Sequence, residues 1–219
     1  MKYDIIAFML SCLMILSYYL YLGWRTRRTP DSSVHSLNTR VRERWVKMIM
    51  NSDRMDILAI QTLRNSVMAS NFMASTAILL IIGTLNISER IGQWVLTWHI
   101  NSSVSSFSTE LWQIKLCLLM LDFSIAFYCF SMAIRFFNHA GYMINLPSDV
   151  PTENCLYKQT CVYLNRAGGY YSHGTRTFFF SLPIIMWFFG PSFLMLTTFG
   201  LIMGLARLDK VPSWALSAK

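Results

Sequence analysis

Residues 60–85 read IQTLRNSVMASNFMASTAILLIIGTL, a polar start followed by a long apolar run. The run from 67 to 85 has about the length that an α-helix needs to cross a hydrocarbon core of about 30 Å, roughly 20 residues. It is continuously apolar and shows no alternation of period two, which favours a helix over a strand of a membrane barrel. The stretch therefore predicts a transmembrane helix whose first turns, before the apolar run, carry polar residues.

Three further apolar runs of this kind occupy residues 5–24, 116–137 and 178–205. The whole chain is 54% hydrophobic and only 14% charged over 219 residues, far from the composition of an ordinary soluble domain. The first run is too long for the core of a signal peptide and ends at Arg25-Thr-Arg-Arg28, so we expect a retained anchor. The sequence predicts an all-α integral membrane protein with four transmembrane helices in a single membrane domain, residues 1–219.

Basic residues set the expected orientation. Nine of the 19 lysines and arginines lie between the first and second runs, whereas residues 86–113 hold only Arg90. Because positively charged loops stay in the cytoplasm, a protein that crosses the membrane four times would have both termini on the non-cytoplasmic side. In a bacterium, this membrane would be the plasma or inner membrane. Arg207, Lys210 and Lys219 would then lie on the translocated side, against the same rule. The net charge of +8 indicates topology and attraction to anionic lipids rather than nucleic acid.

Two shorter amphipathic segments lie between the runs. Residues 37–50 place Val41, Trp45, Met48 and Ile49 at helical spacing among arginines, which predicts a basic cytoplasmic helix on the membrane face or, alternatively, one packed on the protein itself. Residues 87–98, with two tryptophans on one edge, predict a separate interfacial helix between spans two and three. In the fourth run, Pro183, Gly190 and Pro191 predict kinks.

Polar residues repeat at helical spacing beside two of the spans. Gln61, Arg64, Met68, Asn71 and Ser75 are spaced 3, 4, 3 and 4 apart, and a second stripe includes Ser131, Arg135 and Asn138. An arginine facing lipid at mid-span costs roughly 2.5–3.5 kcal/mol, so both stripes should face protein or water. We expect them to meet near the cytoplasmic end, in a polar cluster with Asn65 and His139. Arginines near helix ends also extend to headgroups, which would explain Arg64 and Arg135 without any site.

Asp122 is the acidic residue inside the third run. It is rotated away from the polar stripe by about 200° and shares a side with Ala126, Cys129 and Ala133. Small residues allow a second helix to come close. We therefore expect the Asp122 carboxyl group to point into a helix contact.

Several motifs together resemble one membrane family. They are residues 57–66 (ILAIQTLRNS), 73–80 (MASTAILL), 134–138 (IRFFN) with Ile144-Asn145, Leu182-Pro183 and 187–191 (WFFGP). This pattern, over roughly residues 44–201, resembles the bacterial and plant family catalogued as a domain of unknown function, number five-ninety-nine. The resemblance implies four membrane spans with polar marks at Gln61, Arg64, Asn65, Arg135, Asn138 and the Gly190-Pro191 step, and it implies no activity.

The functional expectation is non-catalytic. The chain has no metalloprotease motif, phosphate-binding loop or paired carboxylates, and its five cysteines suggest neither disulfides nor a metal site, so we expect no cofactor and no metal. We predict an accessory, assembly or scaffold subunit of a larger membrane complex, in contact with other membrane subunits or with copies of itself. The alternatives are a small-solute or ion transporter or channel acting as an oligomer and, less favoured, a membrane enzyme.

Overall fold

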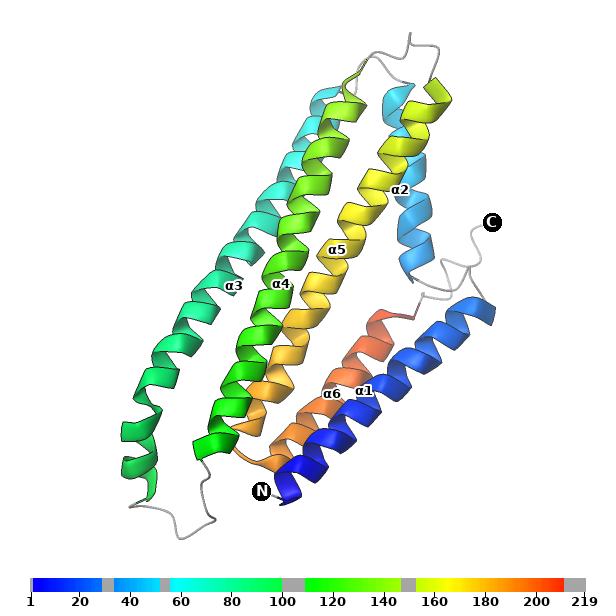
Figure 1. Cartoon of the computed structure of the whole chain (residues 1–219). Coiled ribbons are helices and arrows are strands. Elements are labelled where there is room, and N and C mark those ends of the chain that lie inside the picture. The colour runs from blue at the N-terminus through cyan, green and yellow to red at the C-terminus, as the bar shows by residue number, and fades with distance from the viewer. Residues whose placement is uncertain (1, 29–33, 52–55, 100–108, 147–152, 211–219) are drawn as a thin grey trace.

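The computed structural model describes residues 2–28, 34–51, 56–99, 109–146 and 153–210. These residues form six α-helices (Figure 1): α1 (Lys2–Arg28), α2 (Val34–Met50), α3 (Asp56–His99), α4 (Thr109–Ile144), α5 (Glu153–Trp187) and α6 (Pro191–Leu208). Four helices have segments long and apolar enough to cross a membrane: Lys2–Arg28, Ile57–Ser88, Glu110–Ile144 and Pro191–Leu208. The all-α membrane class predicted from the sequence is confirmed.

The three central helices are longer than a membrane is thick. The helices α3, α4 and α5 have 44, 36 and 35 residues, which corresponds to about 66, 54 and 52 Å at about 1.5 Å per residue, against a hydrocarbon core of about 30 Å. In Figure 1, α6 packs beside the lower half of α5, with α1 next to α6, and α2 lies beside the upper half of α5, while α3 and α4 run along both parts. We call these two parts the membrane half and the helical extension.

The extension has its own core. Val46 and Ile49 of α2 are buried with Leu63 of α3, Phe137 of α4 and Leu164 of α5. The apolar face of α2 therefore packs on the protein itself, which is the alternative interpretation of this basic helix. Val41 and Met48, predicted to share that face, are instead exposed.

Packing in the extension also depends on Arg42. Its guanidinium lies against Gly168 of α5, where the absence of a Cβ leaves room for it, and donates to Oδ1 of the Asn165 side chain at 3.5 Å. Burial lowers the pKa of Arg42. The Asn165 amide also donates to a Glu43 carboxylate oxygen at 3.4 Å, so α2 is joined to α5 by polar contacts as well as apolar ones.

The predicted fourth span, 178–205, is wrong. The chain reverses after Trp187, and α5 and α6 pack side by side in opposite directions (Figure 1). Gly190 carries the reversal with φ of 146°, a conformation that residues with a side chain rarely adopt, and Pro191 opens α6 at a position where its missing N–H costs nothing. Gly190 and Pro191 thus make a turn rather than a kink, while Pro183 lies buried inside α5.

The helices α1 and α6 run in the same direction. Ala7 packs with Leu194 near the start of both helices, and the Tyr18 hydroxyl donates to Asp209 at the end of α6 over 2.6 Å. Lys2 and Lys210 therefore lie at opposite ends of this pair. The expectation that both ends of the chain share one side of the membrane counted residues 178–205 as one crossing, whereas the structure divides this run between α5 and α6.

The segment 87–98 is also not a separate helix. It continues α3 without a break to His99, so the expected division between a span and an interfacial helix is wrong for this segment. The side chains from 89 to 99 lie outside the described part of the structure.

Candidate functional site

The polar stripe of α3 faces away from the rest of the protein. Its five residues are all exposed, whereas the opposite side of the helix buries small residues against α4, including Ala59, Ser70, Ala74 and Ala77. Figure 1 shows α3 at the edge of the molecule, beside α4. We call this outward surface the α3 polar face; it consists of Gln61, Arg64, Met68, Asn71 and Ser75.

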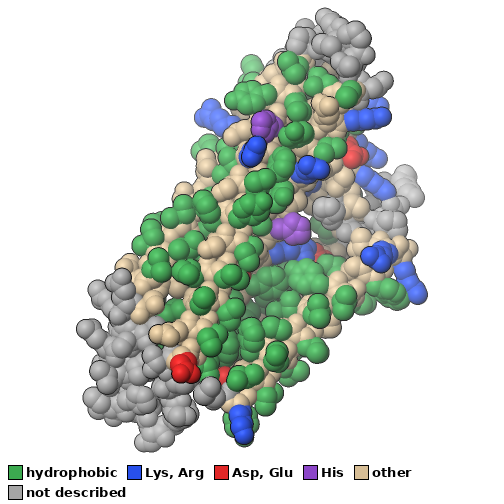
Figure 2. Space-filling view, viewed as in Figure 1, with side chains coloured by type: hydrophobic (Ala, Val, Ile, Leu, Met, Phe, Trp, Pro, Cys, Tyr) green, Lys and Arg blue, Asp and Glu red, His purple; other side chains and the backbone are tan. Residues whose placement is uncertain are grey.

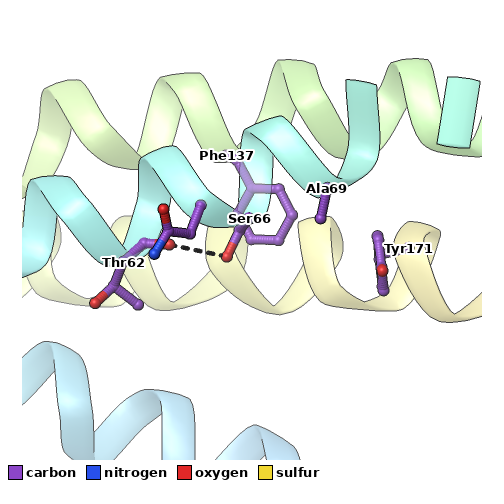
Figure 3. Close-up of a pocket in the computed structure, with 6 residues that line it drawn as sticks. Thr62, Ser66, Ala69, Phe137 and Tyr171 are labelled. Carbon is purple, nitrogen blue, oxygen red and sulfur yellow. Dashed lines mark hydrogen bonds between the residues drawn. The ribbon is translucent and has the colours of Figure 1, made fainter. Parts of the chain in front are cut away.

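A hollow of about 410 Å³ lies next to this face, between α3 and α5 over the ring of Phe137 (Figure 3). Thr62 and Ser66 line it, but their hydroxyl groups donate to the carbonyls of Leu58 and Thr62 at 2.9 and 3.1 Å. The Asn65 amide and Tyr171 are the other polar side chains of this lining. Because Thr62 and Asn65 are exposed, the hollow opens onto the surface.

A second hollow of about 290 Å³ lies between α3 and α4. It brings together Arg64 and Asn138, two of the residues predicted to share a cluster, and also Tyr142 and Asn145. Both hollows lie in the helical extension or at its border with the membrane half. The predicted polar cluster is therefore divided between two surface hollows rather than gathered in one site.

The remaining predicted residues lie elsewhere on α4. The imidazole ring of His139 contacts Tyr163 of α5 with a centroid separation of 5.8 Å, which places it on the α5 side. Arg135 is exposed and Ser131 is half-buried. The structure thus joins Arg64 with Asn138 but does not join either of them with His139.

Asp122 lies in the membrane half and is 9% exposed, on the same buried side of α4 as Ala126, Cys129 and Ala133. Its Oδ2 atom is buried and has no hydrogen-bond partner among the described residues. A buried carboxyl oxygen without a partner is costly, so this atom needs an explanation.

Two further charged groups of the membrane half were not predicted as site residues. Lys115 is 5% exposed; its ammonium donates to the carbonyl oxygen of Trp187 at 2.9 Å and lies 3.9 Å from the Asp4 carboxylate. Arg176 of α5 pairs with Asp209 after α6, and Asp209 also accepts from Tyr18 of α1. Lys115 precedes the predicted third span by one residue, and Arg176 lies two residues before the predicted fourth, so both were overlooked as loop residues.

No group of three or more histidine, cysteine or acidic side chains lies together as a potential metal site within the described ranges. The polar groups described above form an exposed α3 face with two open hollows, and separate charged positions inside the membrane half.

A family profile matches most of the chain. The profile of the family described as "Protein of unknown function, DUF599" matches residues 6–213, more than the motifs alone delimit. No curated protein and no solved structure matches the chain. Since the match covers nearly the whole sequence, the chain belongs to the DUF599 family.

Proposed function

We propose that this protein is a non-catalytic accessory or assembly subunit of a larger membrane protein complex, and that the α3 polar face is its docking surface. One observation carries the proposal: a stripe of polar side chains points outward from a helix that enters the membrane. Within the described residues, α4 supplies the main packing partner of α3, and it covers the opposite side.

The depth of Asn71 and Ser75 supports a protein partner. These residues flank Ala74, which packs in one cluster with Ala126 and Phe130. The Phe130 ring lies 5.7 Å from that of Phe178, in the part of α5 that lies beside α6. At this depth an amide without a hydrogen-bond partner costs about 2–7 kcal/mol, depending on the reference state. A partner helix that offers polar groups would remove this cost.

Charge supports a partner different from this chain. In a symmetric dimer through the α3 polar face, Arg64 would lie near its own copy, and like charges repel. The extension is also basic on its surface: among its described residues, the exposed cations are Arg40, Arg44, Lys47, Arg64, Arg135, Lys158 and Arg166. We expect a partner with acidic or carbonyl groups opposite Arg64, and anionic lipid headgroups around the other cations.

The same charges support an orientation. Figure 2 shows basic side chains over the upper half of the molecule and the upper end of α1, and hydrophobic side chains over much of the lower half. The second half of α5 lies alongside α4 and α6. In this arrangement it would be a fifth membrane-crossing segment beside them. With the extension in the cytoplasm, Arg207 and Lys210 lie on the cytoplasmic side with Arg25, Arg27 and Arg28, and Lys2 lies outside.

One charge reversal and one loss of a polar side chain on the α3 polar face test the docking role. We expect Arg64→Glu and Asn71→Leu each to deplete the co-purifying partner from mild-detergent extracts, measured by native mass spectrometry. A loss of about 1.4 kcal/mol weakens binding about tenfold. Lys158→Glu, at another exposed cation of the extension, is the matched control and should retain the complex. An intact complex in both α3 variants, or equal loss in the control, contradicts the proposal.

Transport through an oligomer is the second candidate, favoured by the charged residues inside the membrane half. Lys115, Asp122 and Arg176 are the kind of group that marks ion pathways when it lies within a bilayer. A flux of ions or small solutes into liposomes that contain the purified protein, abolished by Asp122→Asn, would favour this candidate over the docking role.

A further inference from the structure

The depth of Asp122 in the membrane half follows from contacts on either side of it. Toward the start of α4, Lys115 reaches the carbonyl oxygen of Trp187 at the end of α5. One residue after Asp122, the ring of Phe123 lies 6.0 Å from that of Phe178. Since α4 and α5 are antiparallel, this register places Asp122 level with residues 179–181 of α5, inside the membrane half.

The nearest basic side chains on α4 and α5 lie above and below the level of Asp122 and pair with other acidic residues. Lys115 is two helical turns away, about 10 Å along the axis of α4, and pairs with Asp4. Arg176 lies beyond residues 179–181 on α5 and pairs with Asp209. Residues 73–85 of α3 and 177–187 of α5 include no ionisable side chain. Between the basic residues at its two ends, α1 contributes Tyr3, Asp4, Cys12, Tyr18, Tyr19 and Tyr21; α6 contributes Arg207, and α4 itself adds Cys117, Tyr128 and Cys129.

A backbone acceptor lies at the same level. Pro183 has no N–H, so the carbonyl of Phe179, one helical turn earlier in α5, lacks its usual helical donor. A protonated carboxyl group can donate a hydrogen bond, whereas a carboxylate only accepts. The α5 side of Asp122 therefore suits the neutral acid better than the anion.

We propose that Asp122 is a proton-binding site inside the membrane half, held as a neutral carboxylic acid that donates toward α5. A bare carboxylate at this buried position, with an unpartnered Oδ2, would be strongly destabilised, and binding of a proton removes the charge. When the proton leaves to water, the carboxylate remains and loses its donor function, which weakens the contact between α4 and α5. This inference goes beyond docking and does not depend on the α3 polar face.

Carbodiimide labelling of the full-length protein in liposomes tests the site. A hydrophobic carbodiimide reacts with protonated carboxylic acids, and the modified peptide is identified by mass spectrometry. We expect Asp122 to be modified at neutral pH and less at strongly alkaline pH. Asp4 and Asp209, which pair with Lys115 and Arg176, are internal controls and should remain unmodified. Modification of the two controls without Asp122 contradicts the proposal.

Two further measurements separate the remaining outcomes. Protection of Asp122 by sodium at constant pH would show a metal-cation site and overturn the assignment to a proton. Infrared spectroscopy reports the acid without any reagent: the carbonyl band of a protonated carboxylic acid should be present in the wild-type protein at neutral pH and absent from Asp122→Asn. Identical spectra of these two proteins in that region would overturn the proposal even if the carbodiimide failed to reach the site.

Discussion

At the residue scale, small side chains decide how closely α4 and α5 approach. A Cβ at Gly174 would lie 2.9 Å from the ring of Phe130, which is fully buried. At Gly169, five residues earlier on the same helix, a Cβ would meet no atom within 4 Å. The two positions therefore form a natural pair for testing the packing between α4 and α5.

Gly174→Ala should destabilise the protein. Overpacking costs about 1–3 kcal/mol and exceeds the gain of up to about 1 kcal/mol from replacing a helical glycine. Thermal unfolding in detergent should show a lower Tm for Gly174→Ala and an unchanged or higher Tm for Gly169→Ala. An equal Tm for the two variants would mean that Phe130 does not limit this contact.

The sequence predicted some residues of the site well and others poorly, for physical reasons. Helical spacing predicted the side of α4 on which Asp122 lies, because angular position depends only on local geometry. Helical spacing could not predict which helix packs against the polar stripe of α3. In the described part of the structure, α3 has neighbouring helices on one side only, and the stripe lies on the other side. The capture of the Trp187 carbonyl by Lys115 depends on a contact between residues 72 positions apart, which no local pattern encodes.

At the element scale, the pair α5 and α6 shows why hydropathy alone misplaced a span. Residues 178–205 are apolar throughout, so a sliding window cannot distinguish one long helix from two short apolar pieces joined by a turn. Two signals pointed to the turn: the Gly190-Pro191 step, and the basic residues after 206 that conflicted with four crossings. The first three spans, by contrast, overlap the candidate spans of α1, α3 and α4.

The turn itself predicts a second stability effect. Gly190→Ala places a Cβ on a backbone with φ of 146°, which should cost about 1–3 kcal/mol. Gly200→Ala lies in the middle of α6, where a Cβ meets no atom within 4 Å, and is the control. A lower Tm in detergent is expected for Gly190→Ala alone. If Gly190→Ala matched the wild-type Tm, the turn would not require a glycine.

At the scale of the whole molecule, the parallel course of α1 and α6 predicts the sides on which the chain ends lie. In a variant without the native cysteines, Lys2→Cys should react with an impermeant thiol reagent added to intact cells. Lys210→Cys should react only after permeabilisation. The physical reason is that the two helices lie parallel in the structure, so their corresponding ends should lie on the same side. Labelling of both positions from one side would refute this topology.

The whole molecule also explains why the polar start of α3 is tolerated. Residues 56–66 lie largely in the extension, where Gln61 and Arg64 are exposed and water can solvate them in the absence of a partner. Asn71 and Ser75 lie deeper and still face outward, so solvation by headgroups does not account for them. This difference in depth separates the docking role from the simpler explanation of arginines that extend to the membrane surface.

Photo-crosslinking inside native membranes tests the docking role most directly. A photoreactive amino acid at Asn71 should give a discrete adduct with one membrane protein, and the same residue at Leu16, exposed on α1 away from α3, should give no such adduct. Crosslinking of Asn71 to lipid alone, or the same adducts from both positions, would contradict the account.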